Sequence, residues 1–346
     1  MASGLGARVH GSRPQQQRKR STDPAWHETV RHSVRAPAFR APAFRGPAFR
    51  IACPGGGQND RPARLVRQSG SCALIVAAER GYFRARDLEV ELIARRPDGP
   101  QAGRRRAADL AITYRPNLHI QVAQGLPLVR IGTLVATPLN TLVTLDGGPV
   151  RSIADLKAAR SGFSVGGFED ALLKAMLARH GLGLADITLV NVNFALSPAL
   201  VSGQVDAVIG AFRNFELNQL ALLGRQGRAF YVEEEGVPAY DELVLVANRT
   251  SVTTDPARFR RFIDAVEDGT RYLVNHPDES WRLFIARHRN LDDELNRRAW
   301  RDTLPRFALR PAALDSARYR RFPAFLVEQG LIPRVLPVQD YAIELP

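Results

Sequence analysis

The stretch from Asn191 to Asn218 constrains the fold most, because a short helix, a buried strand and a polar segment follow one another in it. Residues Pro198 to Ser202 suit a short helix, with Gly203 as its C-terminal stop. Residues Asp206 to Ile209 are then too short and too apolar for an exposed helix, so we predict a buried strand.

Polar side chains follow this strand at once, at Arg213, Asn214, Glu216 and Asn218. Ligands in open α/β sheets bind beyond the carboxyl ends of the strands, so this segment indicates a binding crevice. The start of a solvated helix would be equally polar, and the spacing by itself leaves both interpretations open.

The length of 346 residues exceeds one typical hydrophobic core and suggests two lobes. The net charge of +13 belongs mostly to the N-terminal region, because residues 1–70 hold thirteen Lys or Arg against three acidic residues. We therefore expect no nucleic-acid binding by the folded body.

No segment approaches the roughly 18 apolar residues that a membrane span needs, so we expect no intrinsic span. Cys53 and Cys72 form no Cys-x-x-Cys pair, and we expect neither a metal site nor a cofactor.

Residues 1–68 are predicted to form a disordered basic tail. Residues 36–50 contain three copies of a five-residue unit that ends in Pro-Ala-Phe-Arg, and proline at every fifth position opposes helix and sheet. No apolar run of about 7–15 residues lies near Met1, so no secretory signal is readable.

From about residue 69 onward, short apolar strands alternate with helices. We predict strands over residues 88–93, 108–111, 128–135, 142–145, 187–193, 206–209, 228–232 and 242–247. We predict helices over residues 73–79, 117–125, 171–180, 198–202, 278–288, 291–303 and 312–330, and an apolar helix face over residues 259–273. Residues 95–107 show no periodicity.

Residues 163–170 place Gly166 and Gly167 between a predicted strand and a predicted helix. The unpaired amides of a first helical turn make a ready site for an anion or a polar group. The segment has neither a dinucleotide fingerprint nor a P-loop, since Gly-x-Gly-x-x-Gly and Gly-Lys-Ser/Thr are both missing from it. A tight turn that merely needs glycine would produce the same pattern.

Six segments carry a resemblance to a known family: Gly81-Tyr-Phe, Asp109-Leu-Ala-Ile-Thr-Tyr-Arg-Pro, Pro138-Leu-Asn, Gly162-Phe-Ser-Val-Gly-Gly-Phe-Glu, the run from Ser202 to Glu216, and Pro238-Ala-Tyr-Asp-Glu-Leu. Over roughly residues 72–345 the chain resembles the substrate-binding proteins of ABC transporters that carry thiamine-pyrimidine precursors. These proteins share a fold with the eukaryotic pyrimidine synthases of thiamine biosynthesis.

The resemblance implies an α/β fold of the two-lobed, type II periplasmic-binding-protein kind, with two crossovers between the lobes and a helical C-terminal part. It implies that residues 69–145 and 244–346 form one lobe and residues 146–243 the other. The crossovers would fall near Leu142–Gly147 and Asp241–Ala247. Hinge closure around a ligand follows from such a layout.

An aminopyrimidine ligand requires an aromatic face, a carboxylate for the exocyclic amine, and amides for the ring nitrogens. The resemblance therefore implies a stacking role for Tyr114, for which the alternative is a core tyrosine, and an amine-binding role for Glu216. The other candidate ligand-binding residues are Asn140, Gly166, Gly167, Phe168, Asn193, Arg213 and Asn214.

The first lobe departs from the family pattern. Ser71 stands where such proteins usually carry a histidine, and the usual helix before the Ala-Asp strand is missing from residues 95–107. We therefore predict that the opening strand of this lobe is absent or poorly formed, as a frame error or a decayed copy would produce.

The resemblance implies a monomeric solute-binding protein, without catalysis, that delivers a small heteroaromatic ligand to an ABC permease. The expected ligand is a hydroxymethylpyrimidine or a formylaminopyrimidine, and the expected location is the periplasm or the cell surface. A cytosolic ligand sensor or a decayed paralogue is the alternative. A pyrimidine synthase is disfavoured, because the chain has only Lys19, Lys157 and Lys174 as lysines and no cysteine cluster.

Overall fold

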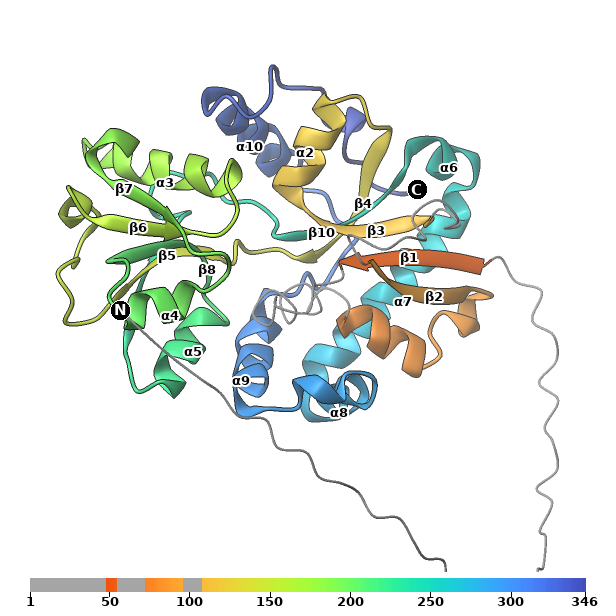
Figure 1. The fold of residues 1–346 in the computed structure, drawn as a ribbon. Coiled ribbons are helices and arrows are strands. Elements are labelled where there is room, and N and C mark those ends of the chain that lie inside the picture. The colour runs from red at the N-terminus through yellow and green to blue at the C-terminus, as the bar shows by residue number, and fades with distance from the viewer. Residues whose placement is uncertain (1–47, 55–71, 96–107) are drawn as a thin grey trace, which may run out of the picture. The chain divides into compact units, whose positions relative to one another are not determined.

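The computed structural model describes residues 48–54, 72–95 and 108–346, which form two five-stranded mixed sheets (Figure 1). The first sheet has the order β2-β1-β3-β10-β4. Its strands are β1 (Ala48–Pro54), β2 (Glu89–Arg95), β3 (Leu110–Tyr114), β4 (Leu128–Val135) and β10 (Leu243–Asn248). Strand β1 runs parallel to β2 and β3, whereas β10 is antiparallel to both of its neighbours.

The second sheet repeats this plan, with the order β7-β6-β8-β5-β9. Its strands are β5 (Asn140–Leu145), β6 (Arg160–Phe163), β7 (Thr188–Asn191), β8 (Ala207–Phe212) and β9 (Gly227–Tyr231). Strand β6 is parallel to β7 and β8, whereas β5 is antiparallel to β8 and β9. Each sheet thus contains one reversed strand, β10 or β5, which the chain forms directly after crossing from the other sheet.

The first crossover lies at residues 136–139, between β4 and β5, and not near Leu142–Gly147 as the sequence suggested. Pro138 lacks a backbone N–H and interrupts the extended chain, so the new strand begins two residues later, at Asn140. The second crossover occupies residues 232–242, so that only the start of the expected range, Asp241–Ala247, belongs to it. The predicted division assigned β5 to the first lobe, whereas β5 belongs to the second sheet. We therefore propose the same two lobes with β5 in the second.

Strand β1 contradicts the prediction that the opening strand is absent or poorly formed. It pairs with β2 over its whole length, from Ala48 opposite Glu89 to Pro54 opposite Arg95, and with β3 at Ile51 and Ala52. The prediction failed because parallel partners distant in sequence supply hydrogen bonds that no local pattern reveals. The rest of the predicted tail, and residues 96–107, lie outside the described residues.

Most helices agree with the sequence patterns in type and lie within a few residues of the predicted ranges, but the helices Glu216–Leu222 and Arg249–Thr254 were not predicted. A helix spans residues 72–79, and the named helices that follow in the first lobe are α2 (Arg115–Ala123), α6 (Arg249–Thr254), α7 (Pro256–Asn275), α8 (Pro277–Arg287), α9 (Glu294–Thr303) and α10 (Ser316–Glu328). The second sheet carries α3 (Phe168–Arg179), α4 (Leu196–Val201) and α5 (Glu216–Leu222). Aspartate caps begin several of them; Asp255, for example, accepts the backbone N–H of Arg258.

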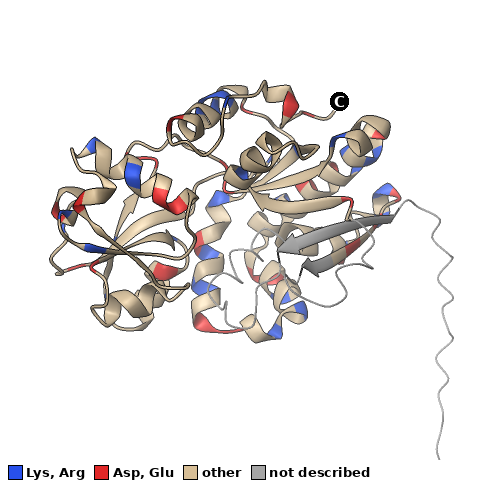
Figure 2. Ribbon diagram, turned by 45° about the horizontal axis from the view of Figure 1, so that its top comes forward, with Lys and Arg blue, Asp and Glu red and all other residues tan. Residues whose placement is uncertain are grey.

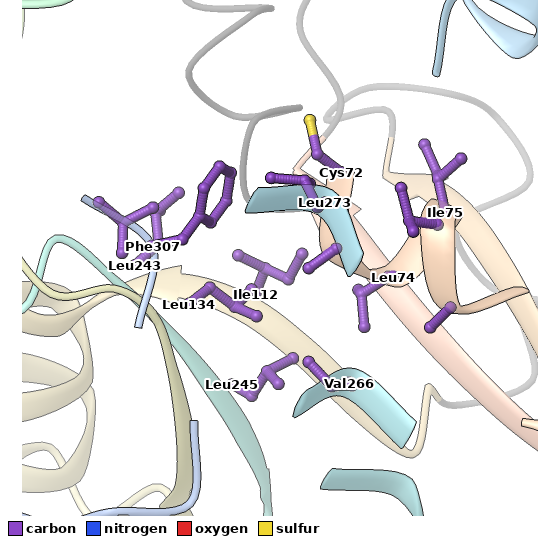
Figure 3. Close-up of a cluster of buried hydrophobic side chains, with 14 of the residues drawn as sticks. Cys72, Leu74, Ile75, Ile112, Leu134, Leu243, Leu245, Val266, Leu273 and Phe307 are labelled. Atoms are coloured by element: carbon purple, nitrogen blue, oxygen red, sulfur yellow. The ribbon is translucent and has the colours of Figure 1, made fainter. Parts of the chain in front are cut away.

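The largest hydrophobic core lies between the first sheet and its helices (Figure 3). Leu74 and Ile75 of the helix over residues 72–79 pack with strand residues such as Ile112 and Leu245 and with Val266 of α7. All five of these side chains are at most 5% exposed, so this burial provides the main stabilisation of the lobe.

Lys and Arg are distributed over helices throughout the described body, and acidic residues are interspersed among them (Figure 2). Within the described part of the chain, no helix is both long and apolar enough to cross a bilayer.

Candidate functional site

A cavity of about 180 Å³ lies at the carboxyl ends of strands from both sheets. The lining residues come from β3 and β8, from the first residue of β5, from the segments that follow β3, β6, β7 and β8, and from the second crossover. They are Tyr114, Asn117, Asn140, Ser164, Val165, Phe168, Glu169, Phe194, Leu196, Gly210, Phe212, Glu216 and Glu242. This position beyond strand ends is where open α/β sheets bind ligands.

Four of the residues expected from the sequence line this cavity: Tyr114, Asn140, Phe168 and Glu216. Tyr114 is the last residue of β3 and is half-buried. Asn140 opens β5 directly after the first crossover, and its buried Oδ1 has no hydrogen-bond partner in the protein. These residues reach one cavity because the strand ends of the two sheets meet there.

Arg213 and Asn214 do not line the cavity, because each side chain is engaged elsewhere. The Nη2 atom of Arg213 donates to Glu233 at 2.7 Å, and its guanidinium lies 4.1 Å from the ring centre of Tyr231. Asn214 is fully buried and donates from Nδ2 to Oγ1 of Thr303 at 2.8 Å.

Gly166, Gly167 and Asn193 lie beside the cavity without lining it. The amide of Gly167 is already bonded, since it donates to Oδ2 of Asp170 at 2.9 Å. Asn193 has a positive φ of 46°, which turns the chain so that the next residue, Phe194, reaches the cavity.

Two further carboxylates line the cavity that sequence reasoning had not assigned, those of Glu169 and Glu242. Both lie in segments that the sequence had made conspicuous, Gly-Gly-Phe-Glu and the second crossover. No local pattern shows which residue of a crossover faces inward, so the direction of Glu242 required the tertiary structure.

Glu169 accepts two backbone hydrogen bonds with its Oε2 atom, from the amides of Ser164 at 2.9 Å and Val165 at 3.0 Å. Burial raises the pKa of Glu169 to about 7, against the opposing effect of these two amides. Gly210 of β8 makes room for this carboxyl group: a Cβ atom there would lie 2.5 Å from the Glu169 carboxyl carbon.

Backbone amides also hold the carboxyl groups of Glu216 and Glu242. Oε2 of Glu216 accepts from Phe212 N at 2.6 Å, and Oε2 of Glu242 accepts from Leu139 N at 2.7 Å. Burial raises the pKa of Glu216 to about 8 and the pKa of Glu242 to about 7. Each carboxyl group therefore gains protein hydrogen bonds without a salt-bridge partner of its own in the cavity lining.

Other aromatic rings pack against Phe168, one of the aromatic residues that line the cavity. The Phe168 ring meets the rings of Tyr240 and Phe322 edge-on, with centroids 5.8 Å and 6.5 Å away. The amide of Phe194 donates to Oγ of Ser164 at 3.2 Å, which joins two of the lining segments. These contacts hold rings in place, and a flat ligand gains from such preorganised faces.

The second crossover is fixed to the first lobe through Asp241, the residue before Glu242. Its carboxylate accepts from Thr133 Oγ1 at 2.9 Å, from Arg318 Nη1 at 2.7 Å and from Tyr319 Oη at 2.8 Å. The carboxylate of Glu242 is therefore positioned by a buried network and not by a free loop.

The family model described as NMT1/THI5 like matches residues 68–280. The chain is 50% identical over 278 residues to a Haemophilus influenzae protein named provisionally as a thiamine biosynthesis protein, with 79% of this chain and 87% of that protein covered. It is 32% identical to a formylaminopyrimidine-binding protein of Halalkalibacterium halodurans, over 62% of this chain and 65% of that protein.

A third relative is an enzyme, the 4-amino-5-hydroxymethyl-2-methylpyrimidine phosphate synthase of Schizosaccharomyces pombe, at 22% identity over 65% of this chain and 68% of that protein. Among solved structures, the periplasmic aliphatic sulphonate binding protein of Escherichia coli matches with a TM-score of 0.66 and 18% identity, covering 86% of this chain and 92% of that one. The chain therefore belongs to the NMT1/THI5-like family, and it has the two-lobed α/β fold of periplasmic binding proteins.

Proposed function

We propose that this protein is a solute-binding protein that clamps a small heteroaromatic ligand of the thiamine-pyrimidine-precursor type. The observation that carries the proposal is the cavity itself, where aromatic rings and three buried carboxyl groups meet between two α/β lobes. The relatives named for thiamine biosynthesis and for formylaminopyrimidine binding support the same class of ligand.

An aminopyrimidine would match the groups in this cavity. Its ring is flat and can stack on Tyr114 or Phe168, and its exocyclic amine can donate to Glu216 or Glu242. The unpartnered Oδ1 atom of Asn140 is an acceptor for a second N–H group. A cavity of about 180 Å³ is smaller than the roughly 300–1,000 Å³ of sites for drug-sized ligands, which favours a single substituted ring.

A thermal-shift screen of the full chain tests the ligand class. The panel contains hydroxymethylpyrimidine, formylaminopyrimidine, thiamine and riboflavin. A tight ligand at a hundredfold excess over its Kd should stabilise the protein by about 2.7 kcal/mol. Absence of a shift with every pyrimidine would refute the assignment of this ligand class.

The variant Glu216→Ala tests whether the pyrimidine binds in this cavity. Removing this buried carboxyl group should weaken pyrimidine binding by about tenfold or more, because a hydrogen bond to a charged group contributes roughly 1.5–3 kcal/mol. Glu328→Ala, an exposed glutamate at the end of α10, serves as the matched control and should leave the affinity unchanged. Equal affinities in the two variants would place the ligand elsewhere.

The proposal includes export and delivery of the ligand to an ABC permease by a monomeric protein. Fractionation of the cells that make the protein checks this part. A strictly cytosolic protein would contradict delivery to a permease and would favour a ligand sensor.

The synthase relative is the observation in favour of an enzyme. Incubation of the protein with each bound pyrimidine, followed by mass spectrometry, distinguishes the two functions. We expect the ligand to be recovered unchanged, and a converted product would show catalysis.

A further inference from the structure

We propose that Glu169 determines the charge specificity of the cavity, by occupying backbone amides that an anionic group of a ligand would otherwise use. The cavity would then accept uncharged or cationic heterocycles that carry N–H donors, and it would exclude phosphate esters and sulfonates. This inference rests on the ligand-binding function proposed above and names the class of ligand more closely.

The first argument is the hydrogen bonding of the loop between β6 and α3. The amides of Ser164 and Val165 both donate to one oxygen of Glu169, at 2.9 Å and 3.0 Å. A pair of amides beside a helix N-terminus is a common binding site for phosphate or sulfonate oxygens. Here the protein supplies the anion itself, so these two donors are not available to a ligand.

The second argument is the charge of the lining. Among the described residues that line the cavity, three are glutamates and none is Lys, Arg or His. Arg213, which the sequence suggested as a ligand-binding residue, is bonded to Glu233 and directed at Tyr231. Glu169 and Glu216 also interact electrostatically with each other, since Glu169 contributes to the raised pKa of Glu216. An anion entering the cavity would meet carboxyl groups and, among the described lining residues, no cationic side chain.

The third argument is that strand β8 has a glycine, Gly210, where it faces the carboxyl group of Glu169. Gly210 in β8 has a φ of +89°, and a Cβ atom on it would lie 2.5 Å from both the carboxyl carbon and Oε1 of Glu169. Only glycine fits at this point, because any side chain would displace the carboxyl group from the amides. The place of the carboxyl group is therefore determined from two elements, the start of α3 and the middle of β8.

Isothermal titration of the full-length wild-type protein, Glu169→Gln and Glu169→Ala tests the proposal. The probes are hydroxymethylpyrimidine, its phosphate ester and inorganic phosphate. We expect the wild type to bind the alcohol and to bind the ester and phosphate at least about a hundredfold more weakly. Glu169→Ala frees both amides and should gain about tenfold or more in affinity for the ester and for inorganic phosphate, whereas Glu169→Gln, whose side-chain oxygen can still accept both amides, should stay near the wild type. Equal anion affinities in the wild type and both variants would overturn the proposal.

Asp155→Ala is the matched control. Asp155 also accepts two backbone amides at a helix start, from Arg151 at 3.0 Å and Ser152 at 2.8 Å, but it does not line the cavity. This variant should not gain anion binding, and an equal gain would show that exposed amides bind anions regardless of the cavity. Glu169→Gln retains the shape and an acceptor oxygen but removes the charge, so it tests the proposal even if the alanine variant folds poorly: a tenfold gain in its anion affinity would show that the charge of Glu169, and not its hold on the amides, excludes anions.

The two probes separate this inference from the proposed function. Gain of phosphate binding by Glu169→Ala without pyrimidine binding by the wild type would support the role of Glu169 and refute the pyrimidine assignment. Pyrimidine binding by the wild type, with the ester bound equally well, would leave the function standing and refute the role of Glu169.

Discussion

At the scale of the residue, the protonation states of three buried glutamates control the charge of the cavity. Burial favours the neutral form of each carboxyl group, and the pKa values of Glu169, Glu216 and Glu242 rise from an ordinary 4.5 to about 7, 8 and 7. A ligand that donates N–H groups, or carries positive charge, returns each group toward its ionised form. Binding and protonation are therefore coupled in this site.

The stability of the unliganded protein should fall as the pH rises from about 4.5 to about 8. In this window the unfolded chain has released protons that the folded carboxyl groups still hold, so the free energy of unfolding decreases with pH. Glu216→Gln should remove up to about 1.4 kcal/mol per pH unit of this slope. Denaturant titrations at several pH values measure it, and an unchanged slope in the variant would show that Glu216 ionises normally in the folded state.

Gly210→Ala should cost more stability than Gly203→Ala, although both glycines have a positive φ. At Gly203 a Cβ atom meets nothing within 4 Å, so only the backbone cost of roughly 1–2 kcal/mol applies. At Gly210 the displacement of Glu169 adds to that cost, and pyrimidine binding should weaken as well. Urea denaturation of both variants provides the comparison, and equal losses would argue against close packing of Glu169 on β8.

At the scale of the element, the first lobe depends on a close crossing between α7 and the helix over residues 72–79. A Cβ atom on Gly269 would lie 2.6 Å from the carbonyl oxygen of Ala73 and 2.8 Å from Cβ of Ala77. The two helices can approach this closely only because Gly269 has no side chain.

Gly269→Ala should therefore destabilise the protein by about 1–3 kcal/mol, even though alanine is the better helix former by roughly 1 kcal/mol. Arg271→Ala, on the exposed face of the same helix, should change the free energy of unfolding by at most about 1 kcal/mol. Thermal and urea unfolding measure both. A stabilised Gly269→Ala protein would mean that helix propensity outweighs the crossing.

At the scale of the whole molecule, two hydrogen bonds join residues 214–218, at the start of α5, to α9 of the first lobe. Asn214 Nδ2 donates to Thr303 Oγ1 at 2.8 Å, and Asn218 Nδ2 donates to Asp302 Oδ2 at 2.6 Å. Both lie just after the strand that contributes Gly210 and Phe212 to the cavity. We infer that they stabilise the arrangement in which the lobes hold a ligand.

Thr303→Val should weaken pyrimidine binding by about fivefold or more, because it leaves the buried Asn214 amide without an acceptor, at a cost of roughly 1–3 kcal/mol. Thr254→Val, an exposed threonine of α6, is the matched control and should have little effect. Calorimetric titration of the ligand into both variants checks this. An unchanged affinity in Thr303→Val would show that this bond does not contribute to the clamped state.

The sequence by itself determined the type and place of most elements, because local patterning decides helix or strand where one face is buried. Strand β4 at residues 128–135 and the cavity positions of Tyr114 and Glu216 follow from such patterns together with the family resemblance. The tertiary structure alone decided the rest. The pairing of β1 depends on partners distant in sequence, and the direction of Arg213 away from the cavity depends on Glu233 and Tyr231. The close fit of Glu169 against Gly210 likewise depends on the pairing of β6 with β8, because Glu169 lies in the helix that follows β6 and Gly210 lies in β8. No local pattern encodes that pairing.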